Sequence, residues 1–187
     1  MSAATVRRVA ISELMQAQYR LDREAVDRLL AGGHEPTVHE AAATGDVARL
    51  RGLLDDDPAS VNAWSPDGAQ PLHFAAFFGH VEACRLLLER GADANEHARG
   101  FNGVAPINAA AANEPKPNEV CTEIVRLLLD AGADAAAAQG GGSTALHSAA
   151  MTRNAELVRL LVARGVDPDA ATDDGRTARG LATDLFA

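Results

Sequence analysis

Several residue types are scarce in this chain of 187 residues. Its two cysteines are too few for a disulfide-rich fold, and they favour a reducing compartment. Aromatic residues make up only 4% of the sequence, so a core has to be built from small side chains at close helix contacts. No apolar run approaches the length of a membrane span, and the one at residues 9–11 is too short for a signal peptide. We therefore expect a cytoplasmic protein.

Positive charge is also scarce, and Lys116 is the only lysine. With 17 Lys and Arg residues against 26 Asp and Glu residues, the formal net charge is −9. General nucleic-acid binding and adhesion to anionic lipid both depend on a basic surface. We therefore expect neither a nucleic acid nor a membrane as partner.

The chain is rich in short apolar segments at helical spacing. In the clearest copy, residues 70–91, a set that begins at Leu72 is followed by Gly79, and a leucine-rich set is followed by Gly91. This pattern describes two short helices in antiparallel order, each ended by a glycine. Helices of this length are not stable alone in water, so the pair requires stacked neighbours.

Those neighbours are present at regular intervals. The position of Gln70 has equivalents at Ala105, Thr144 and Thr177, which follow at intervals of 35, 39 and 33 residues. A glycine after an aliphatic run recurs in step at Gly91, Gly132 and Gly165. Two markers that repeat together indicate tandem copies of one structural unit.

A period near 33 residues with a heading such as Gln70-Pro71-Leu72-His73 resembles the ankyrin repeat. The resemblance covers residues 38–182 and is closest to bacterial members of that family. It implies an all-α ankyrin-repeat solenoid, built from helix-turn-helix units with short hairpin loops.

We divide the chain into an N-terminal helical cap at residues 1–37 and an ankyrin-repeat stack at residues 38–187. The stack contains about four repeats plus a truncated C-terminal cap with a single helix. Arg179 stands where the other repeats have an aliphatic residue, which fits a cap whose outer face is exposed to solvent. We expect a monomer; the alternative is self-association through the apolar C-terminal end around Phe186.

The third repeat departs most from the pattern. Asn108 stands where other repeats have histidine, and a six-residue insertion with two prolines falls at residues 113–119. Proline excludes a continuous helix there, so the sequence predicts a loop. Because surface loops accept insertions at little cost, neutral lengthening is favoured over a dedicated binding loop.

No motif indicates catalysis or metal binding. The heading histidines recur once per repeat at positions 39, 73 and 147, and the resemblance gives them a structural hydrogen bond. A metal site would need ligands that converge on one ion. The glycine run at residues 140–142 lacks the lysine and the preceding strand of a phosphate-binding loop. We expect no enzymatic activity, no cofactor, no metal and no catalytic residue.

In the ankyrin family, partner contacts concentrate on a concave face made by the hairpin tips and the first helix of each repeat. Carried over position by position, the resemblance places eight partner-binding residues there: Trp64, Asp67, Phe77, Phe78, Phe101, Asn102, Met151 and Asp173. Aromatic and methionine side chains are common centres of binding energy. For Phe77 and Phe78 the alternative is inward packing against the adjacent repeat.

The resemblance therefore implies a non-enzymatic module that binds a partner protein through the concave face. An acidic module favours a partner with a basic rim around an apolar centre. The alternative is a small-molecule-binding or catalytic groove near the Phe101 loop and the 113–119 insertion. Its polar groups would come from His97, Arg99, Asn102, Asn108 and Asn113.

Overall fold

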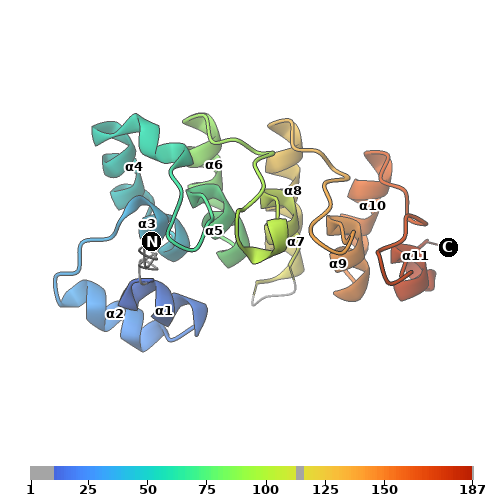
Figure 1. Ribbon diagram of the computed structural model, residues 1–187, viewed down its shortest axis with the longest axis horizontal. Coiled ribbons are helices and arrows are strands. Elements are labelled where there is room, and N and C mark those ends of the chain that lie inside the picture. Colours follow the sequence, from blue (N-terminus) through green and yellow to red (C-terminus); the bar gives the residue numbers. More distant parts are fainter. Residues whose placement is uncertain (1–10, 113–115, 187) are drawn as a thin grey trace, which may run out of the picture.

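A computed structural model describes residues 11–112 and 116–186, and its helices stack in pairs along one axis (Figure 1). The first helices of the pairs are α3 Val38–Thr44, α5 Pro71–Phe78, α7 Pro106–Ala111, α9 Ala145–Met151 and α11 Ala178–Leu181. The second helices are α4 Val47–Asp56, α6 Val81–Glu89, α8 Asn118–Asp130 and α10 Ala155–Ala163. Short 3₁₀ turns follow at Pro58–Asn62, Phe101–Gly103 and Thr183–Phe186. The predicted all-α solenoid is confirmed.

Local sequence signals set the ends of these helices. Pro71 and Pro106 open α5 and α7, where the missing amide hydrogen costs nothing. Gly45 and Gly79 end α3 and α5 in the left-handed conformation, with φ of 73° and 84°. This conformation carries no steric penalty for glycine, so α3 and α5 stop after about two turns and the chain reverses.

The core is made of small side chains in the first helices and leucines in the second. Ala41 of α3 and Ala75 of α5 are fully buried, which allows successive first helices to pack closely. Leu50 and Leu87 close the layer from α4 and α6. The scarcity of aromatic residues is therefore compatible with a continuous core along the stack.

The repeat headings carry the structural hydrogen bond that the resemblance implies. Nδ1 of His73 accepts a hydrogen bond from the backbone amide of Gln70. In the third repeat, Oδ1 of Asn108 accepts the equivalent bond from Ala105, and its Nδ2 donates to the carbonyl of Ala137. Asn108 therefore accepts the same backbone hydrogen bond as the histidine at this position of another repeat.

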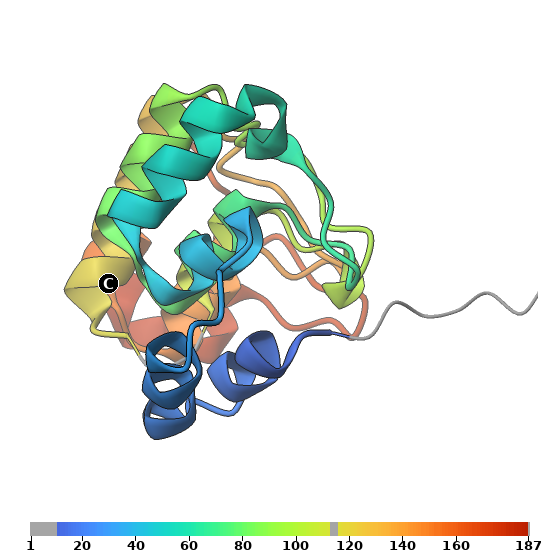
Figure 2. The same ribbon diagram turned by 90° about the vertical axis from the view of Figure 1, so that its left-hand side faces the viewer.

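The hairpin loops lie on one side of the stack, as the view along its axis shows (Figure 2). Backbone bonds join successive tips: Arg99 N to Gly68 O at 2.7 Å, and Gly140 N to the carbonyl of Asn102 at 2.7 Å. At Gly100 a Cβ atom would lie 2.3 Å from the carbonyl oxygen of Asp67, so only glycine permits this approach. The tips therefore form a continuous wall beside the first helices.

The insertion in the third repeat differs from the predicted loop at its C-terminal end. Helix α8 begins at Asn118, so residues 118 and 119 are helical, and α8 has 13 residues where α10 has nine. Residues 113–115 lie outside the described part of the chain. Nζ of Lys116 donates to the carbonyl of Phe77 at 2.7 Å and lies 3.4 Å from the carbonyls of Ala109 and Ala112. The insertion therefore adds a helical turn and caps two neighbouring helices.

The N-terminal segment forms a helical hairpin of α1 Glu13–Tyr19 and α2 Arg23–Ala31. The hairpin lies beneath α3 and α5, away from the line of the helix pairs (Figure 1). Seen along the stack, it lies below the first helices (Figure 2). The segment that we predicted as a cap therefore contacts the side of the stack through α1 and α3.

Candidate functional site

An apolar hollow of about 230 Å³ lies in the groove between the first helices and the hairpin tips. Helices α5, α7 and α9 form its floor, and α1 and the Phe101 loop form its sides. We call this space the aromatic hollow; its principal lining residues are Tyr19, Phe74, Phe77, Phe101, Gln139 and Ser148.

The aromatic rings that surround the hollow pack on one another. The ring centroid of Tyr19 lies 6.5 Å from Phe74, 6.1 Å from Phe78 and 6.2 Å from Phe101, all in tilted arrangements. Phe77 and Phe78 meet edge to face at 5.0 Å. These distances and angles are favourable for ring quadrupoles. One tyrosine thus connects a first helix with the loop of the following repeat.

The hydroxyl group of Tyr19 is fixed by a hairpin tip. It donates a hydrogen bond of 2.5 Å to the carboxylate of Asp67, which also accepts a hydrogen bond from Ser65. Burial of the ring, together with the hydrogen bond and the negative charge of Asp67, raises the pKa of Tyr19 above its ordinary value. The tyrosine is therefore neutral at physiological pH and is held at the edge of the hollow.

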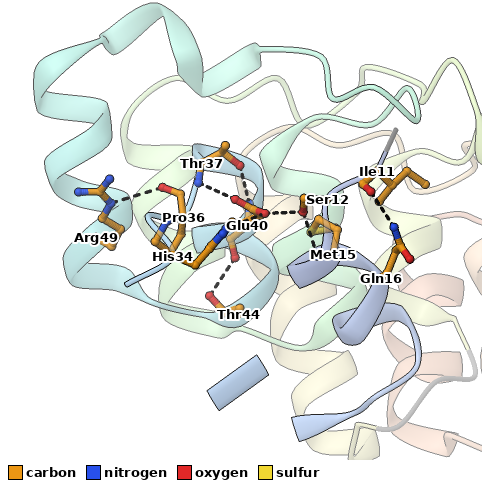
Figure 3. A network of polar contacts seen from close by, with 10 residues as sticks. All are labelled: Ile11, Ser12, Met15, Gln16, His34, Pro36, Thr37, Glu40, Thr44 and Arg49. Atoms are coloured by element: carbon orange, nitrogen blue, oxygen red, sulfur yellow. Dashed lines mark hydrogen bonds and ion pairs between the residues drawn. The ribbon is translucent and has the colours of Figure 1, made fainter. Parts of the chain in front are cut away.

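A buried carboxylate anchors the N-terminal hairpin to α3 (Figure 3). Glu40 is 1% exposed and receives hydrogen bonds from the hydroxyl of Ser12 and the backbone amide of Thr37, with Nε2 of His34 at 3.1 Å. Burial raises the pKa of Glu40, but these hydrogen bonds outweigh it and hold the pKa below the ordinary value. Nε2 of Gln18 adds a bond of 2.6 Å to the carbonyl of Ala43. These polar contacts, together with the buried side chain of Met15 in the core, hold helix α1 against α3.

Four of the eight predicted partner-binding residues are gathered around the aromatic hollow. Phe77 and Phe101 line it, while Phe78 and Asp67 contact Tyr19 beside it. Phe77 and Phe78 are half-buried and also pack against the core, so each rests inward while one side remains accessible. Phe101 is 47% exposed.

The other four predicted residues lie on the hairpin tips and at the end of α9. The ring of Trp64 is covered by the guanidinium group of Arg99 at 4.0 Å from its centroid. Nδ2 of Asn102 donates to the carbonyl of Gly140 at 2.8 Å. Met151 is 56% exposed at the end of α9, and Asp173 is exposed at the last hairpin tip. The fold does not bring these residues to the hollow.

The polar cluster of the alternative hypothesis is largely engaged in structural contacts. Nδ1 of His97 lies 2.7 Å from the carbonyl of Gly103, and Arg99 covers Trp64. The amides of Asn102 and Asn108 are bound to the backbone of the next repeat, and Asn113 lies outside the described residues. These groups are not arranged as a catalytic set.

Sequence reasoning missed Tyr19, because it placed the N-terminal segment at the end of the stack. The residue is the only tyrosine of the chain, but nothing in the local pattern connects it with Phe101. Phe74 was also missed, although it lies between the heading histidine and the two predicted phenylalanines. Gln139 and Ser148 occupy variable positions of the pattern and carry no sequence signal.

Within residues 11–112 and 116–186, no group of three or more His, Cys, Asp or Glu side chains is placed to hold a metal ion. None of the helices described there is long and apolar enough to cross a membrane.

Comparisons with known proteins agree with the architecture. The family model "Ankyrin repeats (3 copies)" matches residues 14–137 and 108–184. Ankyrin repeat and SAM domain-containing protein 6 of Mus musculus is 34% identical over 110 residues, which are 59% of this chain and 12% of the relative. Transient receptor potential cation channel subfamily A member 1 of Homo sapiens is 33% identical over 115 residues, 61% of this chain and 10% of the relative.

NAD-capped RNA hydrolase NUDT12 of Homo sapiens is 44% identical over 55 residues, which are 29% of this chain and 12% of the hydrolase. The chain thus spans only about a tenth of the length of these relatives, and their activities do not transfer with the match. Ankyrin repeats are generally protein–protein interaction modules and are typically non-catalytic. With a family model that covers nearly all of the stack, the chain belongs to the ankyrin-repeat family.

Proposed function

We propose that this protein is a non-enzymatic module that binds a partner protein through the groove around the aromatic hollow. One observation carries the proposal. Tyr19, Phe77, Phe78 and Phe101, all at least partly exposed, gather on this one surface over the buried ring of Phe74. Exposed clusters of aromatic side chains are typical centres of binding energy, and a rigid stack loses little entropy on binding.

The charge of the molecule favours a partner with a basic rim. Asp67 and Asp173 lie on hairpin tips that border the groove, and the whole chain carries a formal charge of −9. Positive residues around an apolar anchor would speed association and fix its orientation. We place the interaction in the cytoplasm, where the buried, free thiols of Cys84 and Cys121 would stay reduced.

Two surface substitutions test the proposal. Phe101→Glu introduces a charge at an exposed ring beside the hollow, whereas Val162→Glu does the same at an exposed apolar residue of the second helix α10. Both variants and the wild type would be used as bait in the native lysate, with captured proteins identified by mass spectrometry. Binding of the captured partner would then be measured with purified protein.

We expect Phe101→Glu to weaken binding by about thirtyfold or more, the usual loss at a binding hot spot, and Val162→Glu to leave it unchanged. Equal binding by both variants would contradict the proposal. Circular dichroism and a urea midpoint close to wild type would show that both variants are folded.

A second candidate function is favoured by the apolar lining of the hollow itself. A cavity of about 230 Å³ with few polar groups also suits a small apolar metabolite. A metabolite would raise the melting temperature of the wild type in a thermal-shift screen. The shift should disappear in Ala112→Leu, which fills the space.

A further inference from the structure

We infer that the aromatic hollow is a socket for one phenol ring, supplied by a tyrosine side chain of the partner protein. The inference rests on the proposed function and specifies the chemistry of the partner. It depends on the size of the hollow, the different character of its two ends and the absence of formal charge in its lining.

The size of the hollow admits a single ring. An apolar cavity of about 150 Å³ is large enough to hold a benzene molecule. The hollow measures about 230 Å³, which leaves room for one ring with a polar substituent. Rings on its walls, including Phe77 and Phe101, can contact a guest ring edge to face.

The two ends of the hollow differ in polarity because different repeats supply them. Tyr19 and Phe74 lie at the α5 end and offer mainly ring surface, since the hydroxyl of Tyr19 donates to Asp67; His73 is the polar residue of α5 in the lining. Gln139 and Ser148 lie at the α9 end, two helices further along the stack. A guest that enters ring first toward α5 would place its polar end beside α9.

The polar groups at the α9 end are free to bind a guest. In the described residues 11–112 and 116–186, the side chains of Gln139 and Ser148 make no hydrogen bond, although both residues are half-buried. Of the other polar lining residues, Asn108 binds backbone groups at both ends of its amide, whereas His73 accepts from Gln70 through Nδ1 and leaves its buried Nε2 without a hydrogen-bond partner. An amide and a hydroxyl together can donate to and accept from a phenol hydroxyl, which does both.

The remaining side chains of a partner fit less well. The residues that line the hollow carry no formal charge at neutral pH, so a Lys, Arg, Asp or Glu side chain would be buried without an opposite charge. A phenylalanine or leucine side chain would fill the space but leave the polar groups of Gln139 and Ser148 buried and unpaired. A tyrosine side chain fills the apolar end with its ring and brings its hydroxyl group to the polar groups at the α9 end.

The test measures binding of small probes to the full chain by NMR chemical-shift titration. N-acetyl-L-tyrosinamide and N-acetyl-L-phenylalaninamide differ only in the hydroxyl group. We expect both to shift the resonances of residues that line the hollow, with tighter binding of the tyrosine probe. Ser148→Ala should weaken the tyrosine probe by about threefold to tenfold and leave the phenylalanine probe unchanged.

Ser143→Ala is the matched control, because it removes a half-buried serine hydroxyl from the same repeat, outside the hollow. Ala112→Leu should abolish binding of both probes by filling the space. If this variant failed to fold, the comparison of the two serine variants would still decide the question. Equal affinity of wild type for the two probes, or shifts confined to other surfaces, would overturn the inference.

The inference and the proposed function fail in different ways. If Phe101→Glu loses the partner while Ala112→Leu retains it, the groove binds a protein but the phenol socket is refuted. If the tyrosine probe binds as expected but Phe101→Glu keeps the partner, the hollow accepts a phenol ring but the partner does not supply it, and the proposed function is contradicted. Loss of the partner from both variants supports both.

Discussion

Tyr19 joins two parts of the chain that are 48 positions apart. Its ring contacts the rings of Phe74, Phe78 and Phe101, and its hydroxyl donates to Asp67. The side chain therefore combines apolar packing with a hydrogen bond to a charged acceptor. Substitutions separate these two contributions.

Tyr19→Phe removes only the hydroxyl group, and we expect it to lower the free energy of unfolding by about 1 kcal/mol. Tyr19→Ala also removes the ring contacts and should cost about 2–3 kcal/mol. Urea unfolding followed by circular dichroism measures both values. A loss in Tyr19→Phe as large as that in Tyr19→Ala would show that the ring contacts contribute nothing.

At the scale of elements, the α1–α2 hairpin is the least firmly attached part of the structure. A hollow of about 420 Å³ separates α2 from Thr44 and Phe78, so this side of the hairpin is poorly packed. Its attachment depends on Tyr19, on the Glu40 network and on the bond from Gln18 to Ala43. Elements with few buried contacts open locally before the rest of a protein unfolds.

We expect backbone amides of α1 and α2 to exchange with solvent deuterium faster than those of α5. Gln18→Ala removes a hydrogen bond to α3 and should speed exchange in the hairpin about fivefold, with no effect on α5. Gln16→Ala is the control, because that side chain bonds to Ile11 within the same segment. Exchange rates in the hairpin that match those of α5, measured by mass spectrometry, would refute this picture.

The α1–α2 hairpin and the groove show which features could be predicted from the sequence and which could not. The helix pairs of the stack could be predicted because two markers recur together at intervals of similar length. One is the segment that opens each repeat, and the other is the glycine after the second helix. The position of the hairpin could not, because it depends on a long-range contact between Tyr19 and Asp67 that no local pattern encodes. The site was predicted only where the family resemblance assigned positions such as Phe77 and Phe101.

At the scale of the whole molecule, recurring histidines couple stability to pH. Burial lowers the pKa of His73 to about 4, and burial also lowers the pKa of His39 and of His80. Between pH 6.5 and 4 the unfolded chain therefore binds protons that the folded chain does not. Stability is fully present above pH 6.5 and is lost as the pH falls through this range.

We expect the urea midpoint of the wild type to fall steadily between pH 7 and pH 5. His73 alone accounts for about 2 kcal/mol of this loss by pH 5, and its contribution reaches about 3 kcal/mol once the pH is below its folded pKa of about 4. His73→Asn, which imitates Asn108 at the equivalent position, should flatten the pH dependence. An unchanged slope in this variant would show that His73 does not carry the effect.

The sequence by itself determined the repeat unit, its helical character and the small-residue core. The signals that specify them, which are helix-ending glycines, apolar residues at helical spacing and the segment that opens each repeat, all lie within one repeat. The stack follows from the same pattern, since each pair leaves an apolar face that its neighbour must cover. Only the tertiary structure decided that α1 packs against α3 beside the groove and that three phenylalanine rings contact one tyrosine. These contacts arise between separate segments, where packing and hydrogen bonding, rather than local propensity, select the arrangement.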